Sequence, residues 1–138
     1  GDKAVSNYWV WGLSWSAGGE RLVSACANGS SCVWDGDSGT ELAYLSKDEA
    51  AVPVKVSWHP NGKKVFRSGF GDSATVWEEG NDGKWSNAAG NMKHDGKGMY
   101  GMQVLSDGQT LCTIQVEVST IYFWDVDTNT LVRKLPLE

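Results

Sequence analysis

Short stretches in which apolar residues alternate with polar or small ones run through the chain. Val52, Val54, Val56 and Trp58 form one such stretch, with the period of two typical of a strand that has one face more buried than the other. No window shows a sustained helical period. The pattern therefore predicts an all-β chain built from short strands.

Turn residues divide these strands into groups. The first two strands of each group are joined at Gly18-Gly19, Asn61-Gly62 and Asp107-Gly108. Glycine and asparagine tolerate the positive φ that two-residue hairpins need. Second strands are expected at 21–25, 64–68 and 110–116, third strands at 31–34, 74–77 and 121–124, and weaker fourth strands at 41–45, 84–88 and 130–135. The sequence thus predicts twelve short strands in three groups of four.

Tryptophans recur at a fixed spacing within these groups. Trp15 and Trp34 are 19 residues apart, and so are Trp58 and Trp77. In the third group Val104 takes the first place, and the second tryptophan follows 20 residues later. The tryptophans that end the third strands are 43 and 47 residues apart, which indicates a repeat architecture.

The three units resemble the WD40 repeat family over essentially the whole chain. Their third strands end in Trp34-Asp35, Trp77-Glu78 and Trp124-Asp125, two of which are the dipeptide that names the family, and the stretch 58–63 is close to the family's first turn. The resemblance implies antiparallel four-stranded blades of a β-propeller, with three blades at about 8–48, 49–93 and 94–138. Closed propellers have roughly 4–8 blades, so three do not close a ring. Either the chain is a segment of a larger propeller, or it self-associates, for example as a dimer that forms a six-bladed ring.

The resemblance also implies a hydrogen-bonded chain inside each blade. The third unit offers His94, Thr113, Glu117 and Trp124 for it. The first unit offers Ser24, Asn28 and Trp34 without a histidine, and the second offers Asp72 or Ser73 with Trp77, again without a histidine.

Charge and cysteine content narrow the class of partner and compartment. The net charge is −5 and the basic residues are scattered, with Lys63-Lys64 and nearby Arg67 as the longest cluster, so we expect a solvated edge strand there and no nucleic-acid binding. No membrane span or signal peptide is present, so no membrane partner is expected. Three cysteines are too few for a disulfide framework and predict reduced thiols in an intracellular, cytoplasmic protein.

The placement of Cys26 and Cys32 depends on the turn at Asn28-Gly29. A two-residue turn would put the two sulfurs on opposite faces of the hairpin, whereas a three-residue loop would put them opposite each other.

Candidate chemistry is sparse. His59 lies in a turn, where a solvated side chain is expected, and no His and Cys spacing matches a zinc site. The stretch Asp35-Gly36-Asp37-Ser38-Gly39 lacks the length and terminal glutamate of a calcium loop, and no nucleophile elbow or phosphate loop is found. We therefore expect no enzyme activity, no cofactor and no metal.

The resemblance instead implies a protein-interaction scaffold that binds other proteins at one rim of the propeller. The candidate aromatic contacts there are Trp9, Trp11 and Tyr100, and the candidate polar contacts in the turns are Asn28, Asp72 and Glu117. Trp11 could instead merely cover an adjacent blade. Two alternatives stay open: a propeller enzyme or carbohydrate-binding module whose site needs further blades, and an engineered or excised fragment without independent function, which the start at Gly1 would fit.

Overall fold

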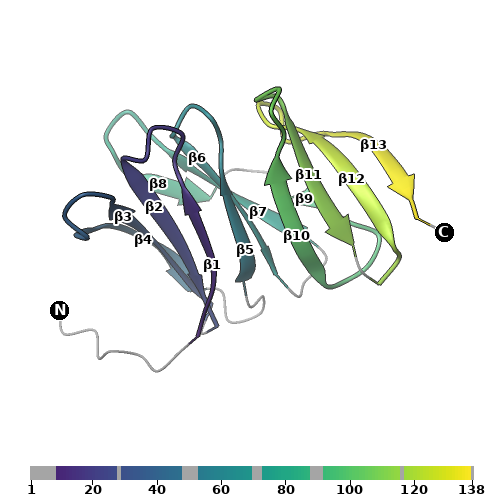
Figure 1. The fold of residues 1–138 in the computed structure, drawn as a ribbon, viewed down its shortest axis with the longest axis horizontal. Helices are drawn as coiled ribbons and strands as arrows, with labels where there is room; N and C mark the ends of the chain where they lie inside the picture. The colour runs from purple at the N-terminus through teal and green to yellow at the C-terminus, as the bar shows by residue number, and fades with distance from the viewer. Residues whose placement is uncertain are drawn as a thin grey trace.

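Three antiparallel sheets stand side by side along the molecule (Figure 1). The computed structural model describes residues 9–27, 29–47, 53–69, 73–87, 92–115 and 117–137. Over these ranges the chain forms strands and turns and no helix, which confirms the all-β prediction. It follows that no helix of the described ranges could cross a membrane.

The strands follow the predicted groups closely. The first sheet has the order β1 (Val10–Trp15), β2 (Arg21–Cys26), β3 (Ser30–Asp35) and β4 (Glu41–Lys47). The middle sheet has β5 (Pro53–Trp58), β6 (Lys64–Gly69), β7 (Ser73–Glu79) and β8 (Trp85–Asn87), and β9 (Met92–Lys93) also pairs with β7. The third sheet has β10 (Met99–Val104), β11 (Thr110–Gln115), β12 (Thr120–Asp125) and β13 (Leu131–Pro136). Only the two-residue strand β9 adds to the twelve that were expected.

The first hairpin of each sheet is longer than predicted. In the first sheet Ser16 N donates to Arg21 O at 2.9 Å, so four residues form the loop, and the expected two-residue turn is wrong. The same loop closes the other sheets, through His59 N to Lys64 O and Leu105 N to Thr110 O. The third loop residue is a glycine with positive φ in every case: Gly19 (73°), Gly62 (74°) and Gly108 (67°).

The three sheets share one register. Trp15 pairs with Leu22, and Leu22 pairs with Trp34. The corresponding rows are Trp58, Val65 and Trp77 in the middle sheet and Val104, Leu111 and Trp124 in the third. Because cross-strand partners lie on the same side of a sheet, each row marks one face. We name the side that carries Trp34, Trp77 or Trp124 the tryptophan face and the other side the reverse face.

Stacking buries two cores. The tryptophan face of the middle sheet packs on the reverse face of the first, where Val23, Ala25 and Val33 lie. The tryptophan face of the third sheet packs on the reverse face of the middle sheet, against Phe66 and Val76. The repeat in sequence is therefore also a repeat in packing, because the tryptophan faces of the middle and third sheets are each covered by the sheet before them in the chain.

The cysteines carry no disulfide in this fold. None of Cys26, Cys32 and Cys112 is bonded to another cysteine. Ser24 pairs with Cys32 and Ala25 with Ser31, so the register matches neither of the two placements of the sulfurs considered from the sequence. Since Ser24 and Cys26 are two residues apart on one strand, the two sulfurs belong to the same face but are offset along it.

Candidate interaction surface

An aromatic pair with one exposed ring lies where β1 begins. Trp9 is 73% exposed, and its ring centroid is 6.3 Å from that of the half-buried Trp11. The backbone of Trp9 is fixed to the turn after β2, because Ala27 N donates to Trp9 O at 2.8 Å. The rim end is our name for the end of each sheet at which its first strand begins and its second strand turns into its third.

The rest of the predicted rim is described only in the third sheet. Asn28 and Asp72 lie outside the described residues, and so does the side chain of Tyr100. Glu117 is exposed, and its carboxylate accepts a hydrogen bond from Lys97 N at 2.8 Å. Beneath it the side-chain amide of Gln115 donates to Lys97 O. The rim end of the third sheet therefore offers polar groups, whereas that of the first sheet offers aromatic rings.

The structure brings His94, Thr113 and Trp124 together in one buried chain of hydrogen bonds. His94 Nε2 lies 2.6 Å and Trp124 Nε1 2.9 Å from Thr113 Oγ1, while His94 Nδ1 lies 3.0 Å from Met92 O. A carbonyl only accepts, so Nδ1 carries the proton of the neutral ring, and Nε2 accepts from the threonine hydroxyl. Trp124 then donates to Thr113, Thr113 to His94 and His94 to Met92. Glu117 stands apart from this chain, bonded to Lys97 instead.

The first sheet repeats half of this arrangement, and the middle sheet does not. Trp34 Nε1 donates to Ser24 Oγ at 2.9 Å. The matching position of the middle sheet is Arg67, which pairs with Thr75 as Ser24 pairs with Cys32. A guanidinium has no acceptor atom, and the buried Trp77 Nε1 has no partner among the described residues. Ser73, the candidate from the sequence, lies instead at the start of β7.

An ion pair next to the hydrogen bonds of His94 makes the folding stability of the protein sensitive to acid. Asp95 Oδ2 accepts hydrogen bonds from Lys134 Nζ at 2.7 Å and Tyr122 Oη at 2.8 Å. These bonds, that of Lys134 first, hold the pKa of Asp95 below its ordinary value of 3.8. A lowered folded-state pKa stabilises the fold above the unfolded pKa, and this contribution is lost as the pH falls through the folded value.

We therefore expect Asp95→Asn to make stability less dependent on pH below 3.8. Urea unfolding of both proteins at a series of pH values measures the difference. Asp107→Asn serves as a matched control, because its turn also holds the pKa of the carboxyl below the ordinary value but involves no lysine. The Asp95 effect should weaken in high salt, whereas that of Asp107 should not. Parallel pH curves for the wild type and Asp95→Asn would contradict the prediction.

Two residues expected in solvent turn out to join the middle and third sheets. Lys64 is buried, and its ammonium donates to Val126 O at 2.9 Å and to Asp127 O at 3.2 Å. His59 is buried as well, and its Nε2 lies 2.7 Å from Asp127 Oδ1. The expectation of a solvated edge strand and a solvated turn is therefore wrong at both positions, because the next sheet covers them.

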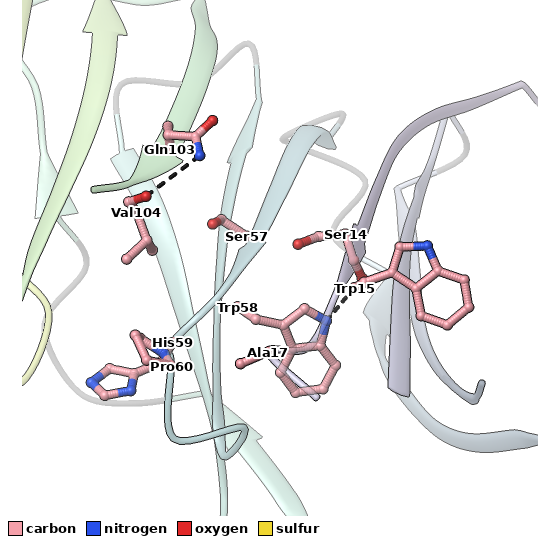
Figure 2. Close-up of a pocket in the computed structure, with 9 residues that line it drawn as sticks. All are labelled: Ser14, Trp15, Ala17, Ser57, Trp58, His59, Pro60, Gln103 and Val104. Carbon is pink, nitrogen blue, oxygen red and sulfur yellow. Dashed lines mark hydrogen bonds between the residues drawn. The ribbon is translucent and has the colours of Figure 1, made fainter. Parts of the chain in front are cut away.

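A cavity of about 240 Å³ lies where the first strands of the three sheets approach one another (Figure 2). In the cavity wall Trp58 Nε1 of the middle sheet donates to Ser14 O of the first sheet at 2.9 Å, and the Trp15 ring points away from Trp58. His59 is its titratable wall residue, and both ring nitrogens are engaged, since Nδ1 accepts from Asn61 N at 3.0 Å. The ring thus holds the turn, and the described wall places no base beside a nucleophile.

In the acidic turn considered for calcium, the first aspartate accepts hydrogen bonds from backbone amides of the same turn. Asp35 Oδ1 accepts from the amides of Asp37 and Ser38 at 3.0 and 2.8 Å, and Asp125 Oδ1 does the same in the third sheet with Asp127 and Thr128. Within the described ranges no group of three or more His, Cys, Asp or Glu side chains is placed to hold a metal ion.

No protein-family model matches this chain, and no curated protein is significantly similar to it.

Proposed function

We propose that the chain forms three consecutive blades of a WD40-type β-propeller and works as a scaffold that binds other proteins at its rim end. The observation that carries the scaffold role is the contrast among the tryptophans. Trp58 and Trp124 are each 4% exposed within the stack, whereas Trp9 is 73% exposed beside Trp11. An exposed tryptophan beside a second aromatic ring on a fixed backbone is a typical anchor for a protein partner, since it buries a large area with little loss of rotamer freedom.

The blade arrangement is supported by the shared register and by the stacking. Each sheet carries four strands in sequence order, with β9 added beside β7 in the middle sheet, and the first strands β1, β5 and β10 lie on the same side of the stack (Figure 1). This is the order of strands in a propeller blade, whose first strand faces the ring axis. The cavity between these strands would then open on the central channel.

Substitution of the aromatic pair tests the scaffold role. We expect Trp9→Ala or Trp11→Ala to weaken binding of a captured and then purified partner about 30-fold, the effect of losing a hot spot worth about 2 kcal/mol. Calorimetry or surface plasmon resonance gives the affinity. Val132→Ala, which removes an exposed apolar side chain from β13, serves as the matched control and should leave the affinity unchanged. A partner that binds both tryptophan variants as tightly as the wild type would refute binding at this pair.

A further inference from the structure

The tryptophan face of the first sheet has the apolar residues of a covered face, but no sheet of the described ranges lies on it. Leu13 and Trp15 are 62% and 55% exposed, whereas Val56 and Trp58, at the same positions of the middle sheet, are 7% and 4% exposed. Leu22 and Trp34 continue the row and are only half-buried. The residues on this face are as apolar as those that the stack buries elsewhere.

The reverse face of the third sheet, at the other end of the stack, is also uncovered. Phe123 occupies the position of Val33 and Val76, both of which are fully buried in the two cores. Phe123 itself is half-buried, and its neighbours Ile114 and Leu135 are 41% and 42% exposed. In the two existing contacts a reverse face of this kind receives the tryptophan face of the sheet that follows it.

We propose that the reverse face of the third sheet docks on the tryptophan face of the first sheet in a second copy of this chain. The docking repeats a packing mode that the chain already uses twice. Two such contacts between two copies would close a ring of six sheets, and six lies within the roughly 4–8 blades of closed propellers. The ring rests on the proposed propeller arrangement but not on partner binding at the rim end.

Charge on the two faces favours a second copy as the occupant. Arg133 lies over the Phe123 ring at 4.1 Å, on the reverse face of the outermost strand of the third sheet. Glu41 pairs with Trp34 on the tryptophan face of the outermost strand of the first sheet. The outermost strands of neighbouring sheets approach each other in the existing stack, because Ala43 of β4 and Trp85 of β8 pack in the same core. Ala43 occupies the place in the first sheet that Arg133 occupies in the third. Docking would therefore bring Arg133 near Glu41 of the other copy.

The docked contact would lack one feature of the existing ones. Arg21 and Lys64 begin the second strands of their sheets, and each reaches the sheet that follows, Arg21 through Glu79 at 3.0 Å and Lys64 through Val126. The third sheet has Thr110 in this place, held by Asp107 of its own turn. The contact between copies would thus depend on apolar burial and on the Arg133–Glu41 pair, which makes it reversible on dilution.

Sedimentation equilibrium of the full chain at a series of micromolar concentrations tests the proposal. We expect a reversible species of twice the chain mass. Trp15→Ser should raise its dissociation constant by about 30-fold or more, and Arg133→Glu by about tenfold. The double variant Arg133→Glu/Glu41→Arg should regain most of the affinity that the single change loses. These side chains are exposed or lie on an uncovered face, and circular dichroism and urea unfolding verify that each variant folds.

Several outcomes would overturn the proposal. A chain that stays monomeric at every concentration would exclude a second copy as the cover of these faces. A ladder of ever larger assemblies would exclude the closed ring, because a head-to-tail contact that does not close forms filaments. A double variant no better than Arg133→Glu would exclude the charge contact. Trp9→Ala should leave the dimer intact, so loss of rim binding and loss of docking are separate results.

Discussion

Thr113→Val is expected to destabilise the chain by about 2–4 kcal/mol, because it leaves two buried polar groups without partners at once. Thr113 is fully buried, and its hydroxyl both accepts from Trp124 Nε1 and donates to His94 Nε2. Valine has nearly the same shape, so the substitution removes the hydrogen bonds without opening a cavity. Urea unfolding followed by tryptophan fluorescence gives the change in free energy.

Thr113→Ser is the matched control for this substitution. It keeps the hydroxyl and removes one methyl group, so its cost should stay near 1 kcal/mol. Ser24→Ala offers a second comparison, measured at low protein concentration so that the chain is monomeric. Trp34 is only half-buried there, so water can replace the lost Ser24 hydroxyl as the acceptor for Trp34 Nε1. Equal losses for Thr113→Val and Thr113→Ser would show that the hydroxyl of Thr113 contributes no more than its methyl group, which would contradict the prediction.

The strands could be predicted because their signals are local. Alternation locates each strand, and the glycines at 19, 62 and 108 locate each first turn. The loop length could not be read in the same way, since a positive φ is needed both in two-residue turns and in the four-residue loops that form here. Strand β9 escaped because two residues, Met92 and Lys93, are too few to show a period.

The contacts between sheets could not be predicted, because they join residues far apart in the chain. A lysine at the start of a strand is normally expected in solvent, and nothing near Lys64 in sequence indicates that Val126 O would accept a hydrogen bond from its ammonium group. Arg67 did leave a usable signal. It stands ten residues before Trp77, as Ser24 stands ten residues before Trp34, so comparison of the copies would have placed it at the hydroxyl position.

The ammonium of Lys64 shows how such a contact stabilises the stack. Besides the carbonyls of Val126 and Asp127, it donates to Asn129 Oδ1 at 3.2 Å and lies 3.3 Å from Glu78 Oε1. The lysine is 6% exposed, so little water reaches these acceptors. Removal of such a buried cation is costly, because its acceptors stay desolvated and lose the donor that compensated for this.

We expect Lys64→Met to destabilise the chain by about 2–4 kcal/mol, since the apolar stem is kept and the buried carbonyl of Val126 and the carbonyl of Asp127 lose their donor. Lys63→Met is the matched control, because Lys63 is exposed, and surface changes of this kind usually stay within about 0.5 kcal/mol. Hydrogen exchange adds a local readout: amides of β12 and of the 126–129 turn should lose protection before those of β2 and β3. A uniform loss of protection across all three sheets would mean that Lys64 supports the whole chain and not the contact between the middle and third sheets.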